Sequence, residues 1–141
     1  MILLDTDHLS IVVNRNAVEH NALVSRLDDS EDSLGVPVIC VEEQCQGWLA
    51  KIHRARDVHH QIAAYERLTN LFHFFEDWEI IPFQTADADA FLRFRKQKVR
   101  IGSQDLKIAA IAVTHNALLL SANLRDFRQV PGLRVESWLQ A

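Results

Sequence analysis

The 141-residue sequence is poor in the residue types that mark disulfide-stapled or linker-rich proteins. Its two cysteines, Cys40 and Cys45, have a spacing that matches neither a CxxC motif nor a disulfide framework. We therefore expect two reduced, half-buried thiols on neighbouring structure, as suits a cytoplasmic protein. With four glycines and three prolines, the chain has no flexible linker, and a single domain over residues 1–141 is expected.

Long apolar runs and an overall basic charge are missing as well. No stretch reaches the roughly eighteen apolar residues that a membrane span needs. The start, MILLDTDHLS, lacks the basic region of a signal peptide and is interrupted by Asp5 and Asp7, so it is read as a first strand. The net charge of −4 argues against a general nucleic-acid binder. Basic residues do gather between 93 and 107, where they either track a phosphate backbone or form a solvated helix face.

Short apolar runs alternate with helical patterns along the chain. Extended segments are expected at 2–4, 36–41, 79–83, 117–120 and 134–136. Helices are expected within 6–13, from about 42, over 57–75 and 86–98, and after an N-cap at Ser103, with a polar loop at 28–35. This alternation predicts an α/β fold with a parallel sheet covered on both faces and right-handed crossovers.

Aromatic and aliphatic side chains fall on helical stripes, which favours packing over base stacking. In the helix expected at 57–75, apolar residues recur every three or four positions and predict one buried stripe: Ile62, Tyr65, Leu68, Leu71 and Phe75. We assign the aromatic residues of the helices to packing or to a dimer face, namely Trp48, Tyr65, Phe91 and Phe94.

Acidic and amide side chains lie near the ends of the expected strands. Ligands of open parallel sheets bind beyond the carboxyl ends of the strands, so these residues are candidates for a shared site. Asp5 closes an apolar strand, where a carboxylate is unfavourable unless it is paired, hydrogen-bonded or bound to a metal. The others are Glu43 after the second strand, Asp105 in a first helical turn, and Asn123 and Asp126 after the fourth strand.

Taken singly, three of these acids have simpler explanations. Asp105 could complement a helix dipole, Asp126 could be a turn residue, and Glu43 could be a solvated helix residue. Gathered together, such carboxylates repel one another and require a cation. Oxygen ligands favour Mg²⁺ or Mn²⁺, while the seven histidines and two cysteines show no zinc-ligand spacing.

Three segments resemble the PIN-domain family, in particular the VapC-type toxins of bacterial toxin–antitoxin pairs. They are LLDTDHLS, VICVEEQCQGW and IGSQDLKIAAIAVTHNALLLSANLRDFRQVPGLRVESW. The resemblance implies a three-layer α/β/α fold with a central parallel sheet of four or five strands. It selects Asp5, Glu43 and Asp105 as the acids, Glu43 rather than Glu42 because the family's glycine, here Gly47, stands four residues on. The family's fourth acid falls at Asn123.

The resemblance further implies a Mg²⁺-dependent endoribonuclease that is a homodimer, acts in the cytoplasm and is blocked by a VapB-type antitoxin. The implied metal ligands are Asp5, Glu43, Asp105, Asn123 and Asp126, with Mn²⁺ as a possible substitute ion. We expect Thr6 and Ser121 either to hydrogen-bond ligand carboxylates or to serve only as capping and strand-end residues. Candidates to hold RNA phosphates are Arg100, Lys107 and Arg125.

Three alternatives stay open. The DTD triplet after a strand also resembles a haloacid-dehalogenase-type phosphatase, but no lysine and no paired acids follow Ser121 as that fold requires. Because Asn123 replaces an acid, the chain could be a PIN-like module that binds RNA or a partner without cutting. A nuclease for RNA maturation with no toxin role is the third.

Overall fold

The computed structural model describes residues 1–139, in which five parallel strands form one sheet. The strands are β1 (Ile2–Leu4), β2 (Leu34–Pro37), β3 (Glu79–Ile81), β4 (Leu118–Leu120) and β5 (Arg134–Glu136). Their spatial order is β3-β2-β1-β4-β5, and every neighbouring pair is parallel. The predicted parallel sheet is therefore confirmed, with five strands.

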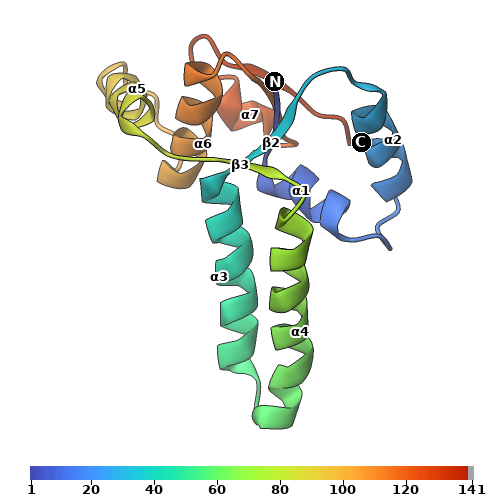
Figure 1. The fold of residues 1–141 in the computed structure, drawn as a ribbon. Helices are drawn as coiled ribbons and strands as arrows, with labels where there is room; N and C mark the ends of the chain where they lie inside the picture. Colours follow the sequence, from blue (N-terminus) through green and yellow to red (C-terminus); the bar gives the residue numbers. More distant parts are fainter. Residues whose placement is uncertain (140–141) are drawn as a thin grey trace.

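Helices flank the sheet and make each crossover between parallel strands (Figure 1). They are α1 (Thr6–Val13), α2 (His20–Asp29), α3 (Val38–Arg54), α4 (Val58–Phe75), α5 (Thr85–Lys96), α6 (Ser103–Thr114) and α7 (Leu124–Phe127). The chain first moves from β1 outward to β3, then returns across the sheet to β4 and β5. With right-handed crossovers, α1 to α4 cover one face and α5 to α7 cover the other.

This reversal makes β1 and β4 the point where neighbouring strands send their connections to opposite faces. A crevice opens beyond the carboxyl ends of such strands, and it is the usual ligand site of this class of sheet. Asp5 follows β1 directly, and Ser121 follows β4 directly. The topology therefore sets these two side chains opposite each other.

The core is centred on the inner strands and on α6. All three residues of β1 are at most 2% exposed, and five consecutive residues of α6, from Ile108 to Ala112, are fully buried. A helix buried on all sides suits the covered face of a sheet. On the face of α6 that carries Leu106, Ala109, Ala110 and Val113, the first three are buried and Val113 is half-buried. Within residues 1–139, no helix has both the length and the apolar character to cross a bilayer.

The predicted strand at 36–41 is wrong in its second half. The strand β2 ends at Pro37, and α3 starts at Val38 instead of near residue 42. Ile39 and Cys40 are buried helix residues of α3. A short apolar run rich in β-branched residues does not separate a buried strand from a buried helix turn, and this one divides at the proline. A second difference is small: Gly102, not Ser103, is the N-cap of α6.

The predicted buried stripe of α4 holds only at the end of the helix. Leu71 and Phe75 are buried, whereas Ile62 and Tyr65 are 50% and 52% exposed. Figure 1 shows the reason, because α3 and α4 form a long hairpin that extends away from the sheet. In that hairpin α4 packs mainly on α3. The part of the stripe that lies away from the sheet is therefore not covered by it. Tyr65 is therefore not a core residue.

Gly35 in β2 provides a test of the packing. A Cβ there would lie 3.0 Å from Cγ1 of Ile81 and 3.1 Å from Cδ2 of Leu3. We expect Gly35→Ala to lower the free energy of unfolding by about 1–3 kcal/mol, since overpacked cores strain their neighbours. Chemical denaturation would measure the change.

The matched control is Gly47→Ala. Nothing lies within 4 Å of a Cβ at this helical position. Alanine is favoured over glycine in helices by about 1 kcal/mol, so this variant should be stabilised. A Gly35→Ala protein as stable as the parent would contradict the packing described for β2.

Candidate active site

Asp5 lies at the switch point beyond the carboxyl end of β1 and is a buried residue, only 6% exposed. Its side chain caps α1, where Oδ1 accepts the N–H of Thr6 at 2.8 Å. Oδ2 accepts the hydroxyl of Ser121 at 2.7 Å. Burial raises the pKa of Asp5 to about 6, and the negative charges of Asp7 and Asp105 add to the rise. Asp5 is thus held in place while its charge remains unneutralised.

Asp7 lies beside Asp5 and is the most strongly hydrogen-bonded acid of the site. Its Oδ1 contacts Nδ1 of His8 at 2.5 Å, and its Oδ2 accepts the N–H of Ala122 at 2.9 Å. Partial burial would raise the pKa of Asp7, but the hydrogen bonds from His8 and Ala122 outweigh it and lower the pKa. Asp7 is therefore the firmly ionised neighbour of Asp5.

Glu43 reaches the same place from the second turn of α3. Its Oε1 accepts the hydroxyl of Thr6 at 2.9 Å. Partial burial raises the pKa of Glu43, helped by the charge of Asp105. Single side-chain atoms of Asp5, Glu43 and Cys40 lie within 4.8 Å of one another, close enough to share an ion.

Asp105 and Asp126 enter from the opposite face, joined by Asn123. The Nδ2 of Asn123 donates to Oδ2 of Asp105 and to Oδ2 of Asp126, each at 3.2 Å. Burial and the neighbouring charge of Asp126 raise the pKa of Asp105. In this arrangement the nitrogen of Asn123, not its oxygen, faces the two acids, so the amide offsets their repulsion.

These carboxylates have no basic partner. In the described part of the chain, all ion pairs involve histidine, and no lysine or arginine lies within 4.0 Å of Asp5, Glu43 or Asp105. The pKa of each of these three is raised by burial, which shows that removal from water is not compensated by a cationic side chain. A cluster of hard oxygen donors with this charge fits a divalent cation such as Mg²⁺ or Mn²⁺.

Comparison with known proteins agrees with this geometry. The family model described as PIN domain matches residues 2–133. The chain belongs to the PIN-domain family. Among curated relatives, a protein named Ribonuclease VapC2 from Haemophilus influenzae is 29% identical over 97% of each chain. Ribonuclease VapC1 of Rickettsia felis is 38% identical over 60 residues, which are 40% of this chain and 45% of that protein.

Solved structures share the PIN fold over nearly the whole chain. One is a crystal structure of VapBC2 from Rickettsia felis bound to a DNA fragment from its promoter, with a TM-score of 0.76 and 24% identity over 99% of this chain and 100% of that one. Another is VapBC-1 from nontypeable Haemophilus influenzae, with a TM-score of 0.77 and 19% identity over the same shares. The family and the three-layer fold expected from the sequence are confirmed.

Within this PIN domain, the predicted acids come together. The basic residues predicted to hold phosphates are not among their hydrogen-bond or ion-pair partners within residues 1–139. The hydrogen bonds expected of Thr6 and Ser121 to ligand carboxylates are present. Arg100 and Arg125 are exposed, and Lys107 donates to Gln104 at 3.2 Å. Their role in holding RNA stays a prediction, as do the ligand roles of the acids and of Asn123.

Part of the basic excess between 93 and 107 has a structural use. Nη1 of Arg95 donates to the carbonyl oxygens of Val99 and Ile101, each at 2.9 Å, and so closes the turn between α5 and α6. Arg95 therefore has a structural role. Its neighbours Arg93, Lys96 and Lys98 are exposed, which fits the second alternative from the sequence, a solvated face.

Sequence reasoning missed three residues of the PIN site. Asp7 stands out in the sequence only as part of the DTD triplet and as a break in the first apolar run, although its place in the first turn after the N-cap is a usable signal. His8 has no metal-ligand spacing to another histidine or cysteine, so the sequence does not single it out. Cys40 is fully buried and its Sγ lies 4.0 Å from Oδ1 of Asp5, a contact that chain spacing does not reveal. Both cysteines are free, as expected, but Cys40 is more buried than predicted.

The raised pKa of Asp5 predicts that Asp5→Asn stabilises the metal-free PIN domain. Asparagine caps helices as well as aspartate does and needs no ionisation. In the parent, protonation of Asp5 contributes to the free energy of unfolding. This contribution is complete below about pH 4 and is lost as the pH rises through about 6. At pH 7.5 we expect a gain of about 1–3 kcal/mol and a melting temperature higher by roughly 3–10 °C.

Thermal unfolding in chelator at pH 7.5 and at pH 4 would test this, and the gain should vanish at the lower pH. The control is Asp57→Asn at the exposed N-cap of α4, where hydrogen bonds from His60 lower the pKa of the carboxyl. That variant should show no gain. An Asp5→Asn protein less stable than the parent at pH 7.5 would refute the argument from burial.

Proposed function

We propose that this PIN domain is a VapC-type endoribonuclease, the toxin of a toxin–antitoxin pair, whose carboxylates hold a divalent cation for the cleavage of RNA. The proposal rests mainly on Asp5, Glu43 and Asp105, which converge at the crevice. Their pKa values are raised, and none of them has a basic partner. The names of the full-length relatives support the same activity.

The residues divide the work by position. Asp5, Glu43 and Asp105 would hold the ion, and Asn123 and Asp126 would form the outer part of the ligand set. A divalent cation bound there would acidify a bound water and stabilise the charge on a phosphoryl group. Thr6 occupies Oε1 of Glu43, which leaves Oε2 free to accept a proton from the attacking water. Addition of water to phosphorus breaks the bond to the 3′ oxygen and leaves a 5′ phosphate.

A protein partner belongs to the same proposal. Solved structures that share the fold are described as VapBC, FitAB and toxin–antitoxin complexes. We extend this to a VapB-type antitoxin that covers the crevice, to a homodimer of this chain and to action in the cytoplasm. Arg100, Lys107 and Arg125 are proposed to hold RNA phosphates around the crevice, where binding should weaken steeply with salt.

One observation favours a second candidate. Because Asn123 turns its nitrogen toward Asp105 and Asp126, the outer part of the site lacks one negative charge and one oxygen ligand. A PIN domain that binds RNA or a partner without cutting would follow if this loss abolished metal binding. Calorimetric titration with Mn²⁺ separates the two, since a non-cleaving module should give no saturable heat.

The cleavage proposal predicts loss of activity in Asp105→Asn. Removing one ligand of the cation should lower the rate of RNA cleavage in Mg²⁺ by at least about a hundredfold, because several kcal/mol of charge stabilisation depend on it. A gel assay on single-stranded RNA measures the rate, and chelator should abolish it. The control is Asp28→Asn in the exposed C-terminal turn of α2. Parent-like cleavage by Asp105→Asn would exclude the proposed site.

The toxin role has a test in cells. Induced expression of the parent chain in a bacterium should arrest growth within one or two generations, whereas expression of Asp105→Asn to the same level should not. Co-expression of the cognate antitoxin should restore growth. Normal growth with an enzyme that is active in vitro would favour an RNA-maturation nuclease over a toxin.

A further inference from the structure

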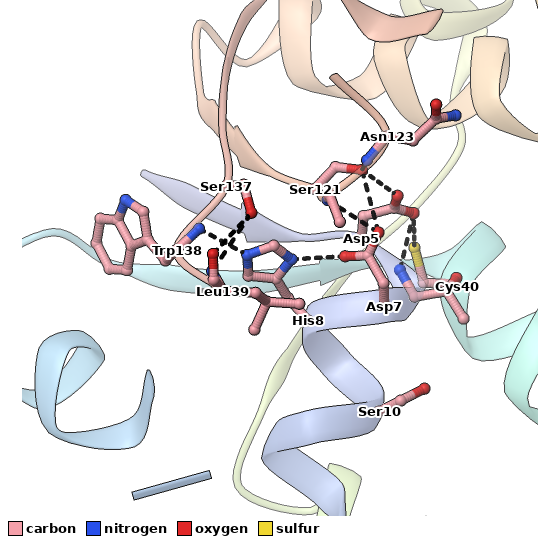
Figure 2. A network of polar contacts seen from close by, with 12 residues as sticks. Asp5, Asp7, His8, Ser10, Cys40, Ser121, Asn123, Ser137, Trp138 and Leu139 are labelled. Atoms are coloured by element: carbon pink, nitrogen blue, oxygen red, sulfur yellow. Dashed lines mark hydrogen bonds and ion pairs between the residues drawn. The ribbon is translucent and has the colours of Figure 1, made fainter. Parts of the chain in front are cut away.

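His8 is a fully buried histidine that joins the candidate active site to the end of the chain. Its Nε2 lies 3.0 Å from the backbone N–H of Trp138, which can only donate, so Nε2 carries no proton. The proton of the neutral ring is then on Nδ1, which donates to Oδ1 of Asp7. Figure 2 shows the ring between Trp138 and Asp7, with both nitrogens in use.

Asp7 also lies near the Ser121 hydroxyl, which donates a hydrogen bond to Asp5. Oγ of Ser121 is 2.7 Å from Oδ2 of Asp5 and 3.4 Å from Oδ2 of Asp7. This hydroxyl has one proton to donate, and it accepts the N–H of Asn123 at 3.0 Å. His8 and Ala122 supply one donor to each oxygen of Asp7. Asp7 is satisfied by these two donors, which leaves the Ser121 proton for Asp5.

We propose that His8 is a positioning residue, which holds Asp7 so that the Ser121 hydroxyl is directed to Asp5. The proposal rests on the proposed function, in which Asp5 is a ligand of the cation. It adds a residue that touches neither the ion nor RNA. Such outer partners of metal ligands change metal affinity or activity by roughly 10–100-fold when they are removed.

The segment after β5 is fixed independently, so it can act as a support. The guanidinium of Arg26 in α2 lies 3.9 Å from the ring centre of Trp138, and Nε1 of Trp138 donates to Glu136 at 2.9 Å. These contacts set the place of the Trp138 backbone N–H before His8 is considered. The Trp138 N–H therefore fixes the tautomer of His8 in which Nδ1 is the donor to Asp7.

Two substitutions separate this role from simple packing. In His8→Asn the amide nitrogen can reach the place of Nδ1, so the donor to Asp7 is kept and the acceptor for Trp138 is lost. In His8→Gln the longer side chain can place its oxygen near Nε2, so the acceptor is kept and the donor to Asp7 is lost. Each variant leaves one half-buried partner of His8 without its hydrogen bond, either the Trp138 N–H or Oδ1 of Asp7, and the two should lose similar stability. His59→Gln, at an exposed position of α4, is the matched control.

The expected result is a split between the two variants. On single-stranded RNA in Mg²⁺, His8→Gln should lower kcat on the order of tenfold with little change in KM, and His8→Asn should stay within about threefold of the parent. Without metal, hydrogen exchange of the Ala122 amide should be faster in His8→Gln and parent-like in His8→Asn. Nitrogen NMR of the parent should find the imidazole proton of His8 on Nδ1.

Equal losses of kcat in the two variants, or a larger loss in His8→Asn, would overturn the positioning role and leave His8 as a packing residue. A proton on Nε2, or unchanged Ala122 exchange in His8→Gln, would overturn it without reference to activity. If the parent itself cleaves no RNA, the proposed function fails. The tautomer and the exchange of the Ala122 amide still decide whether His8 orients Asp7.

Discussion

The burial of the Asp5 carboxylate between the ends of β1 and β4 is the constraint on which the rest of the site depends. The reversal of strand order in this parallel sheet brings the acid after β1 against the serine after β4. At 6% exposure the charge is largely removed from water, and neither of its two closest donors is cationic. The folded state tolerates this group at the expense of stability, as is usual where strain or burial serves a site.

Neutral donors orient the other acids as well. Thr6 donates to Glu43, and Asn123 donates to Asp105, although the acids arrive from different helices. A lysine or arginine at such positions would neutralise the carboxylates and compete with a metal ion for them. Hydroxyl and amide donors fix the direction of each oxygen and leave the charge in place. The crevice therefore combines fixed geometry with a charge that attracts a cation.

The sequence predicted the ends of β1, β4 and β5 well and the contacts between distant segments poorly. Asp5 follows from a general rule about parallel sheets, and the short strands at 2–4 and 134–136 match the structure. Glu43 was placed correctly although its strand was not, because the helix that replaces the end of that strand still points toward the crevice. The contacts of His8 and Asp7 join residues 130 and 115 positions apart, which neither periodicity nor a local motif encodes.

Cys40 shows how folding can change an argument made from spacing. The sequence excluded a zinc site because no thiol stood at ligand distance along the chain, yet folding brings Cys40 near Asp5 and Glu43. Burial raises the pKa of the Cys40 thiol well above its ordinary value, and the charges of Asp5 and Glu43 raise it further. A protonated thiol is a weak donor and not a metal ligand, since the thiolate is the ligand form. The preference for a hard cation thus survives, now because burial and the neighbouring acids keep the sulfur neutral.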